Sequence, residues 1–183
     1  MPKTRLICGI DPGLGTTGYA VIRADDDDDS LSVVDAGVLK CSATQPLPVR
    51  LAELAAGFDE VLNEHAIHAL AVEQIYSHYQ RPRTAILMAH ARGVFLLEAA
   101  RRDLRVINLP STTVKKHLTG NGRASKDQIQ RAVVHVLGLR KIPEPPDVAD
   151  ALAIAACAAG IVSRDEQADA TFADWQTTGR VLP

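Results

Sequence analysis

Hydrophobic residues in the first forty positions gather in short runs, with the length and alternation typical of β-strands. The run at residues 5–10 predicts a buried strand that ends at the turn Asp11-Pro12-Gly13. Two looser runs, 18–23 and Leu31–Lys40, flank a polar segment and predict a hairpin. The polar tip holds five consecutive aspartates, Asp25 to Asp29, without the glycine and the distant glutamate of a calcium loop. We interpret it as a solvated, self-repelling turn.

Beyond residue 45 the apolar spacing switches between helical and strand periods. Residues 46–65 carry apolar side chains at helical spacing, and the apolar run Ala69–Glu73 is typical of a buried strand. The same patterns predict a helix at 82–102, a strand at 104–109, and helices at 111–118, 126–137 and 147–162. A hairpin followed by alternating helices and strands indicates an α/β fold, which we expect to be a five-stranded mixed sheet flanked by helices.

Length and composition fit one domain. The chain has 183 residues, 46% hydrophobic and 23% charged, which is typical of a globular protein with a substantial core. We assign residues 1–162 to a single domain and interpret the polar, aperiodic segment 163–183 as a flexible tail. The most uniform apolar stretch, 151–162, is too short to span a bilayer, and no secretion signal is visible, so we expect no membrane partner.

Cys8, Cys41 and Cys157 are an odd number of cysteines, far apart and in or beside apolar sequence. They show neither a CxxC motif nor the Cys/His spacing of a zinc site. This pattern indicates reduced core residues in a cytoplasmic protein.

Four acidic residues lie at the edges of apolar runs, where ionised carboxylates are uncommon unless they are paired or bind a metal. Asp11 closes the first predicted strand and Glu73 closes the fourth, and strand ends are where ligands gather in open α/β sheets. Asp147 and Asp150 are three residues apart, which places them one turn apart on one helix face. Helix capping is an alternative for Asp147, whereas Asp150 has apolar neighbours and suits that role less well.

Four carboxylates without clustered histidine or cysteine favour Mg²⁺ or Mn²⁺, which prefer oxygen ligands. Two such ions about 4 Å apart would clamp the attacking and leaving oxygens of a phosphodiester. We therefore predict that Asp11, Glu73, Asp147 and Asp150 are catalytic metal ligands.

Charge is distributed unevenly along a chain whose net charge is only −2. Residues 81–141 carry 13 basic and 3 acidic side chains, a net charge of +10, while the flanking segments 1–80 and 142–183 are acidic. Such a block favours a polyanionic partner, most simply a nucleic acid. An arginine-rich helix face that is merely solvated is the alternative.

Lysines in this block are placed where phosphate binds readily. Ser125 to Gln128 fits a capping box, so Lys126 takes the first helical position, where the free N–H groups favour an anion. Lys115, Lys116 and Arg123 precede it and are further candidate phosphate contacts.

Tyr76 lies close to Arg81 and Arg83 and could stack on an unpaired base, although packing against the next helix explains a tyrosine there equally well. The segment 13–18 matches GxGxxG, but strand-like sequence follows it where a dinucleotide fold requires a helix. We interpret its glycines as a turn that lets backbone pass close to a metal site or substrate, and a bare hairpin turn stays an alternative.

Several of these motifs, in order along residues 5–160, resemble the RuvC family of Holliday junction resolvases. They are Gly9-Ile10-Asp11-Pro12-Gly13, Thr17-Gly18-Tyr19, Val72-Glu73-Gln74, Ala91-Arg92-Gly93 and Asp147-Val148-Ala149-Asp150-Ala151-Leu152-Ala153. The resemblance implies a ribonuclease H-like fold, a homodimer, and Mg²⁺- or Mn²⁺-dependent cleavage of two like-polarity strands of a four-way DNA junction in recombination and repair. It also implies work beside a RuvAB-type branch-migration complex.

By position, the resemblance implies that the four acids bind two metal ions and that Lys115 and Lys126 lie near the scissile phosphate. Tyr76 falls where a relative carries a phenylalanine thought to stack at the junction centre. The apolar face of the helix at 82–102 is our candidate for the dimer interface.

Two other classes of function compete with this reading. An actin-like phosphotransferase would need a second copy of the fold and a longer chain. A non-catalytic nucleic-acid-binding module would leave the four acids unexplained.

Overall fold

The structure is a computed structural model that describes residues 4–25, 30–75 and 82–165, with side chains described as far as residue 162. Its centre is a five-stranded sheet in the order β3-β2-β1-β4-β5. The strands are β1 (Thr4–Asp11), β2 (Thr16–Asp25), β3 (Leu31–Lys40), β4 (Ala69–Glu73) and β5 (Arg105–Leu109). β1, β2 and β3 pair antiparallel, whereas β4 pairs parallel to β1 and β5 parallel to β4. The predicted five-stranded mixed sheet is therefore confirmed.

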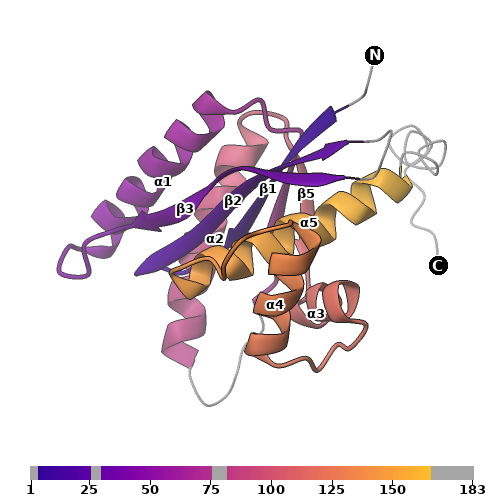
Figure 1. Cartoon of the computed structure of the whole chain (residues 1–183). Helices are drawn as coiled ribbons and strands as arrows, with labels where there is room; N and C mark the ends of the chain where they lie inside the picture. Colours follow the sequence, from indigo (N-terminus) through magenta and orange to yellow (C-terminus); the bar gives the residue numbers. More distant parts are fainter. Residues whose placement is uncertain (1–3, 26–29, 76–81, 166–183) are drawn as a thin grey trace, which may run out of the picture.

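Helices cover both faces of the sheet (Figure 1). α1 (Leu47–Glu64) and α2 (Pro82–Ala100) lie on one face and α5 (Pro146–Asp165) on the other, with α3 (Ser111–Thr119) and α4 (Lys126–Val136) packed beside α5. Alternation along each strand produces these two layers: in β1, Ile7 packs with α5 while Cys8 and Ile10 pack with α1 and α2. Among the described helices, none has both the length and the apolar character that crossing a membrane requires.

Two glycines bring α5 unusually close to the sheet. A side chain added at Gly9 would place its Cβ 2.4 Å from the carbonyl oxygen of Ala151, and one added at Gly18 would lie 2.0 Å from the carbonyl oxygen of Asp147. Such distances are shorter than any ordinary contact, so the backbone of α5 rests directly on the backbones of β1 and β2. Alanines along α5, such as Ala155, are fully buried and keep the helix narrow enough for this approach.

The predicted helices and strands all occur, with ends that differ by a few residues. The last helix begins one residue earlier than predicted and continues to Asp165, three residues into the segment assigned to the tail. The rest of that segment, 166–183, lies outside the described residues, as do the aspartates at 26–29. All three cysteines are thiols: Cys8 and Cys157 are buried and Cys41 is half-buried.

Candidate active site

Asp11 and Glu73 lie side by side at the carboxyl ends of the neighbouring strands β1 and β4. The parallel register pairs Ile10 with Val72, and the next residues on the two strands are the two acids. Because Ile10 and Val72 face α1 and α2, alternation turns both acids toward α5. The neighbouring strand ends predicted from the sequence are confirmed, and the two carboxyl groups share a hydrogen bond.

Asp147 and Asp150 reach the same region from the first turns of α5. Gly18 makes this possible, because it is the cross-strand partner of Asp11 and lies against the backbone of Asp147. Both acids are close enough to Asp11 for their charges to raise its pKa. The structure therefore brings the four predicted acids to one site.

The pKa of Asp11 is strongly raised by its surroundings. Burial, then the charges of Glu73 and Asp150, a hydrogen bond to Glu73 and the charge of Asp147 together raise the pKa of Asp11 to about 8. Burial also raises the pKa of Glu73, against the hydrogen bond from Asp11 and the positive charge of Lys115, which lower it. These shifts favour a proton on Asp11, which donates to Glu73.

Lys126 pairs directly with one of the four acids. Its ammonium donates a 2.9 Å hydrogen bond to Oδ2 of Asp150, and this bond and the nearby acids raise the lysine pKa. The capping box predicted at the start of α4 is present: the Ser125 hydroxyl accepts from the Gln128 N–H, and the Gln128 side chain accepts from the Ser125 N–H. Asp150, which has apolar neighbours in the sequence, thus has a basic partner on another helix.

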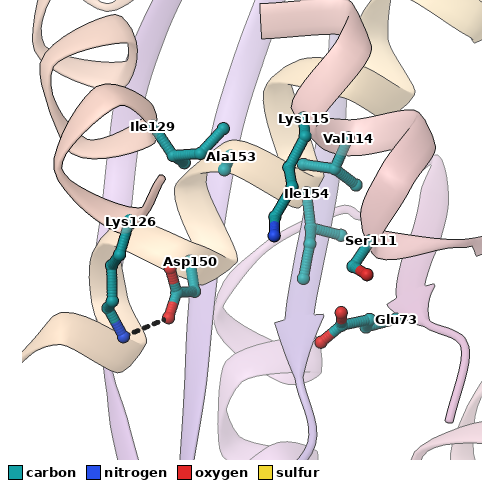
Figure 2. Close-up of a pocket in the computed structure, with 9 residues that line it drawn as sticks. All are labelled: Glu73, Ser111, Val114, Lys115, Lys126, Ile129, Asp150, Ala153 and Ile154. Carbon is teal, nitrogen blue, oxygen red and sulfur yellow. Dashed lines mark hydrogen bonds and ion pairs between the residues drawn. The ribbon is translucent and has the colours of Figure 1, made fainter. Parts of the chain in front are cut away.

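A cleft of about 310 Å³ opens beside the acids, between β4 and the helices α3, α4 and α5. Figure 2 shows Lys126 and Asp150 on one side of it and Glu73 with Ser111 on the other, with the side chain of Lys115 reaching between them. The apolar part of the lining comes from Val114, Ile129, Ala153 and Ile154. A phosphate in this cleft would meet two lysines, and a sugar or base would meet the apolar side chains.

The remaining predicted DNA contacts fall into two groups. Lys116, Arg123 and Arg83 are exposed and lie outside the lining of the cleft. Tyr76 and Arg81 lie outside the described residues.

The donor set fits a hard cation, because it consists of four carboxylates with neither a thiol nor an imidazole among them. No three of these acids have ligand oxygens that all lie within 4.8 Å of one another, so the set is more open than a closed three-ligand cage. Within the described ranges, that closer spacing occurs at Asp35, Glu64 and His65. There Asp35 already accepts from the Tyr19 hydroxyl at 3.1 Å and lies 3.3 Å from His65 Nε2, so hydrogen bonds explain that group.

Two features of the site were not predicted from the sequence. Ser111 lines the cleft opposite Lys126, and its signal was its place two residues after the end of β5, beside the strand that carries Glu73. Arg92 donates from α2 to the main-chain carbonyl of Glu73 at 3.2 Å, a contact between backbone and side chain that residue spacing does not reveal.

Comparisons with known proteins agree with this geometry. The family model described as "Crossover junction endodeoxyribonuclease RuvC" matches residues 7–158. A protein of that name from Rhodopirellula baltica is 54% identical over 151 residues, which cover 82% of this chain and 84% of the relative. One from Desulfitobacterium hafniense is 41% identical over 158 residues, covering 86% and 94%.

Among solved structures, Thermus thermophilus RuvC in complex with a Holliday junction substrate matches with a TM-score of 0.77 and 31% identity. The match covers 84% of this chain and 92% of that one. It confirms the ribonuclease H-like fold that the sequence resemblance implied.

Proposed function

The chain belongs to the RuvC family of crossover junction endodeoxyribonucleases, and from that premise we propose that it resolves four-way DNA junctions by cutting two of their strands. It is a nuclease of recombination and repair that hydrolyses phosphodiester bonds. The observation that carries the proposal is the meeting of Asp11, Glu73, Asp147 and Asp150 at the ends of β1 and β4, beside Lys126 and an open cleft.

The nuclease is metal-dependent, and we assign the four acids as ligands of two divalent ions, Mg²⁺ or Mn²⁺. When bound, such ions activate a water molecule and stabilise the departing 3′ oxygen of the cut strand. The raised pKa of Asp11 supports this assignment, because its causes are burial and three neighbouring carboxyl groups whose charge cations would relieve. The protein orients these acids rigidly: two end strands of the central sheet and two lie on a helix docked against it.

Lys126 and Lys115 would bind the scissile phosphate from two sides of the cleft. The Lys126 ammonium lies 2.9 Å from Asp150 and is 58% exposed, so it can turn toward a phosphate without unfolding α4. Lys115 lines the same cleft from α3. Lys116, Arg123 and Arg83 are exposed and suit contacts with the DNA backbone away from the cut, while stacking by Tyr76 and a contact from Arg81 stay predictions.

We further propose that two copies of the chain act together, because resolving a junction requires two symmetric cuts. Ile86 and Leu97 on α2 are 58% and 51% exposed, and their spacing of 11 residues places them on one helix face. That face is the proposed dimer interface. Cooperation with a RuvAB-type complex and a cytoplasmic location stay predictions.

A cleavage assay tests the function. Purified protein with Mg²⁺ or Mn²⁺ should convert a synthetic four-way junction into paired nicked duplexes, and should leave linear duplex and RNA–DNA hybrid largely uncut. If the unaltered protein fails to cut the junction with either metal, the proposed function is wrong, and a protein that binds the junction without cutting it is the non-catalytic alternative.

Asp150→Asn tests the assignment of the acids. It should lower the cleavage rate by about a hundredfold or more, the scale of losing one preorganised charge contact, while junction binding persists. Asp127→Asn is the matched control, since Asp127 is an exposed acid next to Lys126 that pairs with Arg131 on the helix surface. If the Asp150→Asn protein cuts at the unaltered rate, Asp150 is not a metal ligand, although the proposed junction-cutting activity would still hold.

A further inference from the structure

Arg92 binds the backbone of a catalytic residue from behind the site. Its Nε donates to the main-chain carbonyl of Glu73 at 3.2 Å, and its Nη2 donates to the side chain of Asn108 on β5. The guanidinium therefore ties the last residue of β4 to the neighbouring strand.

The main-chain carbonyl of Glu73 lacks a backbone donor because a proline, Pro12, directly follows β1. In the parallel ladder between β1 and β4, Ile10 pairs with Val72, and Asp11 would pair with Glu73 next. The Gln74 N–H points to β5, where Leu109 accepts it at 2.9 Å, so the carbonyl of Glu73 points the other way, toward β1. The residue whose N–H would reach it there is Pro12, which has none. The ladder indeed stops at Val72, and Arg92 donates in place of the missing N–H.

Arg92 reaches the strand end from the face opposite the acids. α2 packs on the sheet face covered by α1, with Ala91 and Phe95 fully buried in that layer. Glu73 directs its carboxyl group toward α5 on the other face, so Arg92 contacts its backbone and not its reacting atoms.

A guanidinium suits this position better than an ammonium. Arginine presents several N–H donors in a fixed planar fork, so one side chain can hold the Glu73 carbonyl and the Asn108 amide oxygen at once. Lysine offers a single nitrogen at the end of a flexible stem and would keep the charge while losing the fork.

We infer that Arg92 is a positioning residue, which holds Glu73 in place by supplying the hydrogen bond that Pro12 cannot. The inference rests on the proposed function, because it concerns how a metal-binding acid of that site is fixed. Loss of the bond frees the end of β4 and lets the Glu73 carboxyl group move, and a displacement near 1 Å is enough to lower a rate by up to a hundredfold.

Arg92→Lys and Arg92→Gln test this, with Arg101→Gln as the matched control. Arg101 directly follows α2 and forms an ion pair with Glu98. Glu98 also forms an ion pair with Arg102, so it retains a basic partner when Arg101 is replaced. For both Arg92 variants we expect a cleavage rate about tenfold to a hundredfold lower, a higher Mg²⁺ concentration at half-maximal rate, and unchanged junction binding without metal. Hydrogen exchange in the metal-free protein should accelerate at the amides of residues 73–74 and stay unchanged in α1. Arg101→Gln should alter none of these.

A purely structural role would lower the melting temperature but leave the metal dependence of the folded protein unchanged. That outcome, or an Arg92→Lys protein with the unaltered rate, would overturn the inference while the unaltered protein still cuts junctions. The double variant Pro12→Ala with Arg92→Gln adds a direct check, since alanine restores an N–H that can reach the Glu73 carbonyl. It should cut faster than Arg92→Gln alone, and a double variant no faster than the single one would overturn the account of the missing proline donor.

Discussion

Gly18→Ala should separate the geometry of the site from its chemistry, because it alters no charged group. Gly18 pairs across the sheet with Asp11, and its Cα faces the first turn of α5. A methyl group at this position would lie 2.0 Å from the carbonyl oxygen and 2.5 Å from the carbonyl carbon of Asp147. Both atoms belong to helix backbone, so no side-chain rotation can relieve the contact.

The size of the displacement follows from these distances. Real Cβ contacts essentially never fall below 3.0 Å, so β2 and the start of α5 must separate by at least about 1 Å. That movement carries Asp147 away from Asp11 on the opposing strand. We expect a cleavage rate lower by about a hundredfold and a loss of about 1–3 kcal/mol in the free energy of unfolding.

Single-turnover cleavage of a four-way junction at saturating Mg²⁺, with urea unfolding in parallel, measures both quantities. Gly15→Ala is the control in the turn just before β2, since an added Cβ there meets nothing within 4 Å. If Gly18→Ala cuts within a factor of three of the unaltered protein, the close approach of α5 does not set the position of Asp147, and the reasoning fails.

Three further outcomes follow from the same structure. Lys126→Ala should change the melting temperature little, because an exposed ion pair contributes at most about 1 kcal/mol to stability. The substitution should weaken junction binding or cutting and lower the salt dependence of binding. An unchanged cleavage rate together with an unchanged salt dependence would exclude a phosphate contact. Without metal, the raised pKa of Asp11 means that the folded state binds the Asp11 proton more tightly than the unfolded state, so the free energy of unfolding should fall as the pH rises from 4 to 8, by up to about 1.4 kcal/mol per pH unit. Urea titrations of Asp11→Asn should show a flatter dependence of this free energy on pH. Mg²⁺ should stabilise the unaltered protein more at pH 8 than at pH 5. Phe95→Ala should cost about 3–5 kcal/mol, measured by urea unfolding, because Phe95 is fully buried and meets Phe58 edge to face with ring centroids 5.1 Å apart; a loss below 1 kcal/mol would contradict this packing.

Much of the sheet and the acidic site could be predicted from the sequence because each signal was local. Asp11 and Glu73 each end an apolar run, and the rule that ligands gather at strand ends places them together without knowledge of the packing. The spacing of Asp147 and Asp150 likewise defines one helix face.

The contacts that support these acids could not be predicted, because they join residues far apart in the chain. Lys126 and Asp150 are 24 residues apart on different helices, and their ion pair depends on how α4 packs against α5. Gly18 was predicted where a glycine turn meets the strand at 18–23, and it does lie in β2, but its role in helix packing is one that only the position of α5 reveals. Arg92 donates to the main-chain carbonyl of Glu73, and a backbone acceptor leaves no pattern of residue types in the sequence.

The order of the four acids along the chain has a consequence for the cell that makes this nuclease. Asp11 lies in the first strand and Asp150 in the last described helix, so a ribosome must complete nearly all of the domain before the acids can meet. α5 must then dock against Gly9 and Gly18, where the lack of a side chain admits it to the depth at which its acids reach the sheet. Under the proposed assignment, a nascent or truncated chain therefore lacks two of the four metal-binding acids, and DNA near the site of synthesis would meet an active enzyme only after folding is complete.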